Sequence, residues 1–263
     1  METDKIILEK KPETNVAWII FNNPEKYNVY TMEMIAGLKK AVADVEADSN
    51  IDIAVITGKG DKAFCAGAHV SNFEKVDSFT LYRRMKGAMA IHRQIEKSEK
   101  IFIAAVNGAC MGGGFEIALS CDFIVASDRA VFSLPEINLG MITGWGGAVR
   151  LPRNIPPKKA NEIILLGERL TAMEADRYGL INKVVPQGEL PKAVEELIAK
   201  LKSKPKLALA VGKNAIRLGL ETADIDAALE IERGGISVLF SSEDCREGVN
   251  AFLEKRKANF KGK

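Results

Sequence analysis

Two glutamates near the middle of the chain, Glu116 and Glu136, are the residues whose types and surroundings most clearly suggest chemistry. Glu116 follows three consecutive glycines at 112–114 and otherwise has apolar neighbours. A carboxylate in apolar surroundings is costly to bury alone, so it either has a partner or takes part in a reaction. Bare glycine backbone lets N–H groups approach a ligand oxygen closely. Together these features indicate acid–base chemistry beside an oxyanion-stabilising backbone.

From the residues alone, Glu116 has a second explanation that fits equally well. It lies just inside a predicted helix start, where a carboxylate interacts favourably with the helix macrodipole. The glycine segment lacks the Lys-Ser/Thr ending of a phosphate-binding P-loop and does not match G-x-G-x-x-G. A second loop, residues 62–69, has Gly67 between two alanines and follows a predicted strand. If the two loops face each other, they can hold a carbonyl oxygen between two amide donors.

The elements that must position these residues alternate between short β-branched runs and longer helical periods. This alternation predicts an α/β fold. The predicted strands are 16–21, 53–57, 101–106, 122–126 and 130–132, and the predicted helices are 32–45, 81–95, 113–120, 160–166 and 172–178. From residue 190 the chain is strongly charged, and its pattern predicts almost continuous helix. We therefore expect a mixed core over 1–195 that carries the site and a helical region over 196–263.

The composition is that of an ordinary globular protein. The 263 residues are 47% hydrophobic with a formal net charge of +2. A charge this close to zero does not indicate binding to nucleic acid or to a membrane surface. No apolar run approaches the roughly 20 residues of a spanning helix, and the first residues do not resemble a signal peptide. The four cysteines form no C-x-x-C pair and there are only two histidines, so we expect no metal site. Reduced thiols of this kind favour a cytoplasmic protein.

Several motifs, taken in order, give the chain a resemblance to a known family. They are Asn22-Asn-Pro-Glu-Lys-Tyr-Asn28, Ala63-Phe-Cys-Ala-Gly-Ala68, Ala104-Ala-Val-Asn-Gly108, Gly112-Gly-Gly-Phe-Glu116, Cys121-Asp122, Pro135-Glu136, Gly144-Trp-Gly-Gly147, Arg150-Leu-Pro-Arg153, Gly179-Leu-Ile-Asn-Lys-Val-Val-Pro186 and Phe252-Leu-Glu-Lys-Arg-Lys257. With these motifs the chain resembles the enoyl-CoA hydratase (crotonase) superfamily nearly from end to end.

The resemblance implies a spiral of ββα units followed by a C-terminal helical trimerisation region, with homotrimers often paired into hexamers. It implies an acyl-CoA thioester substrate and no cofactor, because coenzyme A is part of the substrate. The oxyanion hole would consist of the backbone N–H groups of Ala68 and Gly113. Both glutamates of the hydratase pattern are present, which favours syn-addition of water to a 2-enoyl-CoA. Glu136 would exchange a proton with the α-carbon and Glu116 would assist hydroxide transfer to the β-carbon, with Gly144 positioning the water or Glu136.

The resemblance also assigns the substrate contacts. Backbone atoms around Ala66, Ala68 and Val70 would lie along the pantetheine and adenine, and Lys255 near the phosphates, from the same or a neighbouring subunit. Two departures from the family pattern, Leu134 and Trp145, fall where they would shape the acyl pocket.

Other departures from the family pattern are His69 for aspartate and Thr143 for proline. We expect His69 to be structural or on the CoA side, and His92 to lie at the surface of a helix.

Three alternatives to a linear enoyl-CoA hydratase remain. Two are enzymes: a hydratase for a cyclic enoyl- or dienoyl-CoA of aromatic acid degradation, and a Δ3,Δ2-enoyl-CoA isomerase. The third is an RNA-binding member with vestigial activity, against which the near-neutral charge and the intact glutamates both speak.

Overall fold

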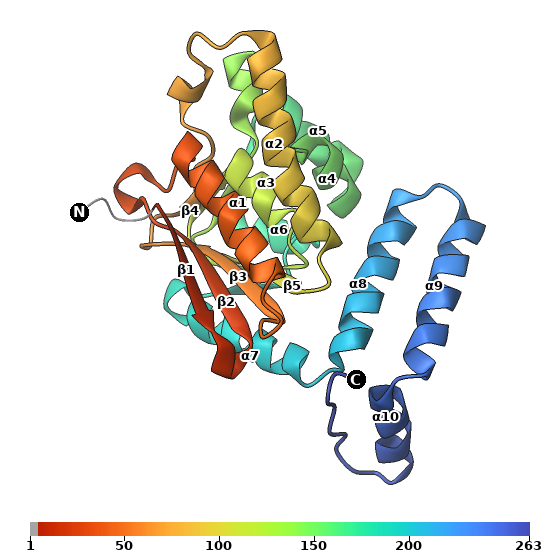
Figure 1. Cartoon of the computed structure of the whole chain (residues 1–263). Helices are drawn as coiled ribbons and strands as arrows, with labels where there is room; N and C mark the ends of the chain where they lie inside the picture. Colours follow the sequence, from red (N-terminus) through yellow and green to blue (C-terminus); the bar gives the residue numbers. More distant parts are fainter. Residues whose placement is uncertain (1–4) are drawn as a thin grey trace. The chain divides into compact units, whose positions relative to one another are not determined.

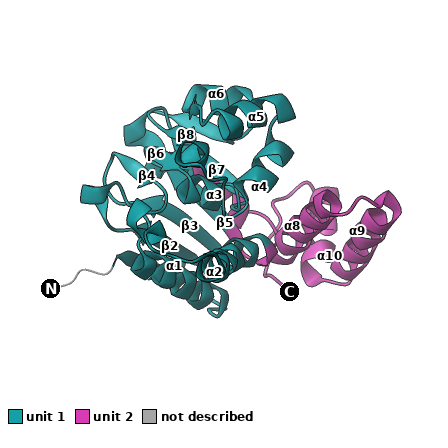
Figure 2. Ribbon diagram, turned by 90° about the horizontal axis from the view of Figure 1, so that it is seen from above, with its two compact units in different colours: residues 1–96, 102–194 teal, residues 97–101, 195–263 magenta. Residues whose placement is uncertain are grey.

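The computed structural model describes residues 5–263 of the chain. These residues form two compact units (Figure 2). The first unit runs to Glu96 and continues from Phe102 to Val194; the second consists of Lys97–Ile101 and Glu195–Lys263.

The first unit holds nearly all of the β-structure. The strands are β1 (Ile6–Lys11), β2 (Val16–Phe21), β3 (Ile53–Gly58), β4 (Ala63–Cys65), β5 (Ile101–Val106), β6 (Ala109–Met111), β7 (Phe123–Ser127), β8 (Val131–Ser133), β9 (Arg169–Thr171) and β10 (Lys183–Val185). The α-helices within residues 5–263 are α1 (Met32–Glu46), α2 (Ser78–Lys97), α3 (Gly113–Ala118), α4 (Gly147–Asn154), α5 (Pro157–Leu165), α6 (Ala172–Arg177), α7 (Leu190–Lys202), α8 (Lys206–Glu221), α9 (Ile225–Phe240) and α10 (Glu243–Leu253). The 3-10 turns in the described part of the chain are η1 (Pro12–Thr14), η2 (Pro24–Lys26), η3 (Val70–Phe73), η4 (Pro135–Leu139) and η5 (Gln187–Glu189).

The strands form two sheets between which the chain alternates. The larger sheet has the order β1-β2-β3-β5-β7-β10 and the smaller has the order β4-β6-β8-β9. After β3 the chain enters the small sheet as β4 and then forms α2; β5, β6 and α3 repeat this course, and β7, β8 and then α4 repeat it again. The fold is therefore a succession of ββα turns, each of which adds one strand to each sheet.

The central strands of the large sheet are apolar because both of their faces are covered. All six residues of β5 are buried, as are five of the six in β3. Parallel strands covered on both faces have continuous apolar sequences of this kind, which made them visible in the sequence. α1 begins as predicted, because the side chain of Thr31 caps it by accepting a hydrogen bond from the N–H of Met34.

A cluster of aromatic rings supports the loop that follows β4. The ring of Phe21 meets those of Tyr30 and Phe64 edge to face, with 5.3 Å between ring centroids in each pair. The Tyr30 backbone donates to the carbonyl of Gly67 at 2.7 Å and accepts from the N–H of His69 at 2.9 Å. The loop around Ala68 is thus tied to the buried core.

The second unit is helical, with α8 and α9 forming an antiparallel pair (Figure 1). The last residues of the chain return to the start of α10, where the buried carboxylate of Asp244 accepts from the N–H groups of Lys261 at 2.6 Å and Gly262 at 2.8 Å. Across residues 5–263, no helix is long and apolar enough to cross a bilayer.

Candidate active site

A cavity of about 540 Å³ opens in the first unit, a size typical of small-molecule sites. Its lining is Ala66, Gly67, Ala68, Val70, Phe73, Leu81, Met85, Gly112, Gly113, Glu116, Pro135, Glu136, Leu139, Met141, Ile142, Thr143, Gly144 and Trp145. The cavity therefore brings together both glutamates, both expected oxyanion donors and most of the other residues singled out in the sequence.

The smaller sheet explains why these residues meet. β4, β6 and β8 are neighbouring parallel strands, so their carboxyl ends lie along one edge. The loop of Ala68 follows β4, the loop of Gly113 follows β6, and Glu136 follows β8. Residues up to 68 positions apart thus reach one edge of a single sheet.

The first two loops touch, and glycine is what allows the approach. A Cβ on Gly67, which has a φ of 88°, would come within 2.9 Å of the Met111 carbonyl oxygen and 3.6 Å of the Gly112 Cα. Within residues 5–263 the N–H groups of Ala68 and Gly113 donate no hydrogen bond to the protein. Two backbone donors therefore border the cavity without an acceptor of their own.

Glu116 is buried in α3, with 2% of its surface exposed. Its Oε1 accepts two backbone hydrogen bonds, from the N–H of Trp145 at 2.8 Å and from the N–H of Gly147 at 2.7 Å. Burial raises the pKa of Glu116 to about 7, and the nearby charge of Glu136 adds to the rise. The two N–H donors and the charge of Arg150 act in the opposite direction. Glu116 can therefore gain or lose a proton near neutral pH.

Glu136 lies in η4 on the same cavity, and burial raises its pKa as well. Its Oε2 is buried and has no hydrogen-bond partner among the described residues. Its Oε1 lies over the glycine loop, since a Cβ on Gly112 would come within 2.9 Å of this oxygen. A buried carboxyl oxygen without a partner, facing a cavity, is available to a water molecule or a substrate proton.

Trp145 forms one wall of the cavity and fits against the glycine loop. Its ring lies 5.3 Å from that of Tyr30 and 5.8 Å from that of His92, centroid to centroid. A Cβ on Gly113 would come within 2.2 Å of the indole Cζ3, so Gly113 leaves the space that the indole fills. Gly144, beside it, also borders the cavity, and a Cβ there would lie 2.6 Å from the Met85 sulfur.

The remaining predicted contacts are distributed unevenly. Ala66 and Val70 line the cavity. Leu134 is fully buried and is not among the lining residues; it packs beneath Gly147, where a Cβ would come within 3.0 Å of its Cδ1. Lys255 belongs to the second unit, following α10 with a φ of 55°.

The two histidines differ in their environments. His69 is exposed, and its Nδ1 lies 2.6 Å from the Ser71 hydroxyl at the start of η3, which suits a structural role. The expectation that His92 lies at the surface is wrong: it is 1% exposed, and burial lowers its pKa to about 4. It belongs to the buried face of α2 together with Ala88 and Ile95. That spacing of three and four residues was the signal that the sequence offered.

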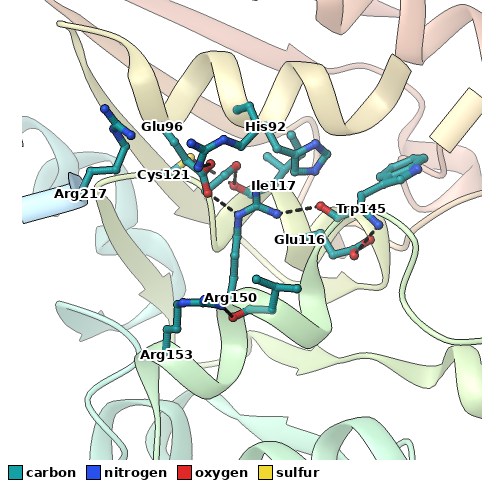
Figure 3. A network of polar contacts seen from close by, with 12 residues as sticks. His92, Glu96, Glu116, Ile117, Cys121, Trp145, Arg150, Arg153 and Arg217 are labelled. Carbon is teal, nitrogen blue, oxygen red and sulfur yellow. Dashed lines mark hydrogen bonds and ion pairs between the residues drawn. The ribbon is translucent and has the colours of Figure 1, made fainter. Parts of the chain in front are cut away.

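The sequence reasoning also missed the part played by Arg150. Its guanidinium contacts Glu96 and the carbonyl of Trp145 (Figure 3). Arg150 appeared only as a letter in a motif, because its partner Glu96 lies 54 positions away in the chain. Among residues 5–263, no group of three potential metal-binding side chains comes together.

Comparisons with known proteins agree with this geometry. The family model described as enoyl-CoA hydratase/isomerase matches residues 11–263. The chain belongs to the enoyl-CoA hydratase/isomerase family.

Three relatives within this family match along almost their whole length. A crotonyl-CoA hydratase of Syntrophomonas wolfei is 40% identical over 262 residues, 99% of each chain. A short-chain-enoyl-CoA hydratase of Clostridium acetobutylicum is 38% identical, covering 98% of this chain and 97% of its own. The crystal structure of an enoyl-CoA hydratase from Bacillus anthracis superposes with a TM-score of 0.91 at 32% identity, covering 98% of this chain and 100% of that one. The predicted crotonase-type α/β fold is confirmed.

Proposed function

We propose that this protein is an enoyl-CoA hydratase, a hydro-lyase that adds water across the 2,3 double bond of an enoyl-CoA thioester. The observation that carries the proposal is the cavity in which two carboxyls of raised pKa, Glu116 and Glu136, lie beside two unengaged backbone donors. The names of the relatives support the same reaction.

The chemistry follows from what each group has available. The N–H groups of Ala68 and Gly113 would receive the thioester oxygen, on which negative charge develops when the β-carbon is attacked. Removing one such donor typically costs about 100- to 1000-fold in rate. Because both donors belong to backbone tied into the fold, they need no rearrangement as the charge develops.

Water would be held between the two carboxyls. Glu116 has one oxygen occupied by two N–H donors, which leaves Oε2 for the water, and Oε2 of Glu136 has no hydrogen-bond partner within residues 5–263. The water oxygen bonds to the β-carbon and gives its proton to Glu116. The electron pair of the double bond forms a new bond from the α-carbon to the proton delivered by Glu136. A proton then returns from Glu116 to Glu136 through exchange with solvent, and Gly144 would help to position the water.

We propose a short linear acyl group as the substrate. Trp145 fills space at the wall of the cavity beside Gly113, and Leu134 acts on the pocket only through Gly147, on which it packs. The relatives with crotonyl-CoA and short-chain names support this size class. No cofactor enters the proposal, because the CoA moiety arrives with the substrate.

Ala66, Ala68 and Val70 would contact the pantetheine, and Lys255 the phosphates. Lys255→Asn tests the phosphate contact, because Asn tolerates the left-handed φ at this position. We expect KM for the CoA ester to rise while kcat is unchanged. An unchanged KM would remove Lys255 from the proposal.

A homotrimer or hexamer is also part of the proposal, with residues 1–195 carrying the site and 196–263 the assembly surface. The second unit exposes large apolar side chains on α8 and α9, namely Leu207, Ile216, Leu220, Ile225, Leu229, Ile236, Val238 and Phe240. Such a surface favours self-association. Sedimentation equilibrium measures the mass directly, and a monomer at micromolar concentration would contradict this part. The four free cysteines support a cytoplasmic location.

Hydration of crotonyl-CoA tests the proposed reaction. We expect the enone absorbance of the thioester to fall on adding wild-type protein, and kcat to drop about 100- to 10,000-fold in Glu116→Gln and in Glu136→Gln. Glu33→Gln, on the exposed first turn of α1, is the matched control and should retain full activity. Near-normal rates in either active-site variant would refute the assignment. A panel that includes cyclic enoyl-CoA and 3-enoyl-CoA esters separates the related hydratase and isomerase activities.

A further inference from the structure

The carboxyl of Glu116 is held by a turn that needs support of its own. Both of its donors, the N–H groups of Trp145 and Gly147, belong to residues on either side of Gly146, which has a φ of 109°. Glycine loses more conformational freedom on folding than any other residue, so the peptide groups around it have no intrinsic reason to keep one orientation. The N–H of Gly147 belongs to the peptide group that follows Gly146, so the direction of its hydrogen bond depends directly on that orientation. The N–H of Trp145 belongs to the peptide group that precedes Trp145 in the same turn.

The side chain of Arg150 contacts this turn from the side opposite Glu116 (Figure 3). Its Nη1 donates to the carbonyl oxygen of Trp145 at 2.7 Å. The same nitrogen occupies the space beside Gly146, where a Cβ would come within 2.0 Å of it. The backbone N–H of Arg150 also donates to the carbonyl of Gly146 at 2.9 Å. Arg150 therefore holds the two peptide groups that flank Gly146, the first through its side chain and the second through its backbone.

Glu96 in turn fixes the guanidinium. Its Oε1 accepts from the Nε of Arg150, and its Oε2 pairs with Arg93 at 2.7 Å. The side chains of Arg150 and Glu96 are only 12% and 16% exposed, so the pair is largely shielded from water. A shielded charge pair is costly to bury and costlier to break, which makes its geometry stiff. The chain of contacts runs from α2 through α4 to the turn.

We propose that Arg150, oriented by Glu96, is a positioning residue that holds the turn around Gly146 so that its two N–H groups aim the carboxyl of Glu116 at the cavity. This inference rests on the proposed function, since it assigns Arg150 a role through Glu116 and none in contact with the substrate.

We call the contacts of Arg150 with Glu96 and with the carbonyl of Trp145 the clamp. Its loss would have two consequences for Glu116. The carboxyl would lose its fixed direction, and a misplacement of about 1 Å can cost about 100-fold in rate. It would also bind its proton more tightly, because the two N–H donors and the positive charge of Arg150 all favour the ionised form. The other charged or titratable groups facing this region are Glu136 from η4, and His92, Arg93 and Glu96 from α2.

The first experiment compares Arg150→Met with Arg153→Met as the matched control. Arg153 lies on the same helix, is exposed, and donates to the carbonyl of Val149 at 2.6 Å. For Arg150→Met we expect kcat on crotonyl-CoA to fall about 10- to 100-fold with KM within about twofold, and the pH limb near 7 to move to higher pH. Arg153→Met should change none of these. A fall in melting temperature with unchanged kcat, KM and pH limb would assign Arg150 a purely structural role and overturn the proposal.

The double variant Glu116→Gln/Arg150→Met tests whether Arg150 acts through Glu116. Residues that act as a unit are non-additive, so adding Arg150→Met to Glu116→Gln should lower the residual rate by no more than about twofold. An equal fold-loss in both backgrounds would show that Arg150 acts elsewhere.

Arg150→Lys separates geometry from charge. One ammonium group keeps the charge but cannot reproduce the fork that reaches both Glu96 and Trp145. We expect its kcat to stay closer to that of Arg150→Met than to wild type, and full recovery would overturn the clamp. If Arg150→Met does not fold, Glu96→Gln takes its place, because it keeps an acceptor oxygen while removing the charge. It should lower kcat in the same direction by less, and an unchanged kcat would count against the proposal.

Infrared difference spectra keep this proposal distinct from the proposed function. The carbonyl stretch of the protonated carboxyl reports the proton on Glu116 without any substrate, with Glu116→Gln as the blank. We expect its titration to move to higher pH in Arg150→Met and not in Arg153→Met. If wild type fails to hydrate any enoyl-CoA yet the titration moves, the proposed reaction is wrong and the clamp stands. If hydration is normal and the titration does not move, the clamp is wrong.

Discussion

Glu116 should make the folded protein less stable as the pH rises towards 7, and this effect can be measured without a substrate. Its pKa is about 7 in the fold against an ordinary value of 4.5, because the carboxyl is buried. The folded state therefore binds the proton more tightly than the unfolded chain does. The contribution to stability is fully present below pH 4.5 and is lost as the pH rises through about 7. At about 1.4 kcal/mol per pH unit, the difference amounts to about 3 kcal/mol.

Glu116→Gln isolates this contribution. A glutamine resembles the neutral carboxyl, and its Oε1 can accept the same hydrogen bonds from Trp145 and Gly147. We expect the variant to gain about 3 kcal/mol of unfolding free energy relative to wild type between pH 4.5 and pH 8. Below pH 4.5 the difference between the two proteins should be constant.

Urea unfolding at a series of pH values, followed by tryptophan fluorescence, measures the difference. Protein concentration is held fixed, because self-association shifts apparent stability. The two proteins are compared at each pH because His92 also changes stability with pH, in the opposite direction. Burial lowers the pKa of His92 to about 4, so the fold loses stability as the pH falls. This contribution is the same in both proteins and cancels in the difference. Differences that vary by less than about 1 kcal/mol across the series would refute the raised pKa, because extrapolation errors are of that order.

Three further predictions concern the surroundings of Glu116. Gly113→Ala places a methyl group 2.2 Å from Trp145 and should cost about 1–3 kcal/mol of unfolding free energy; this cost should shrink in the Trp145→Ala background, and simple additivity in urea unfolding would contradict the contact. Trp145→Ala should raise the ratio of kcat/KM for six-carbon over four-carbon enoyl-CoA; an unchanged ratio would exclude the indole as the limit on chain length. Wild type should lose about 3 kcal/mol more unfolding free energy than His92→Asn as the pH falls from 7 to 4. The reason is that His92 takes up its proton near pH 6.5 in the unfolded chain but only near pH 4 in the fold. Equal losses in the two proteins would contradict this.

The sequence located the long buried strands and the start of α1 because their signals are local. β3 and β5 are runs of apolar residues, and Thr31 caps α1 within its first turn. Four strands of three residues, β4, β6, β9 and β10, were not assigned, because three residues carry little periodicity, although β8 of the same length was. Such strands exist through pairing with distant partners, which local propensity does not encode. The six-residue edge strand β1, half of whose residues are exposed, was not assigned either.

In the candidate site, too, the features with a local signal were predicted and those that depend on distant residues were not. Glu116 and Glu136 were recognisable because a carboxylate among apolar residues is unusual in any sequence. Their hydrogen-bonding environment was not, since the donors to Glu116 come from residues 29 and 31 positions further along the chain. Arg150 and Glu96 are 54 positions apart in the chain, and no local pattern predicts a contact between residues so far apart.

The groups of the site have two structural origins, backbone and side chain, and substitutions affect the two differently. The donors at Ala68 and Gly113 are backbone groups at the ends of neighbouring parallel strands, so their position depends on strand pairing and on glycine rather than on side-chain identity. The carboxyls of Glu116 and Glu136 are side chains added to that frame by α3 and η4. A substitution at either glutamate therefore leaves the two donors in place while it removes a proton carrier. Binding of a thioester and the reaction performed on it are consequently separable in this protein, and loss of hydration in Glu116→Gln should leave acyl-CoA binding intact.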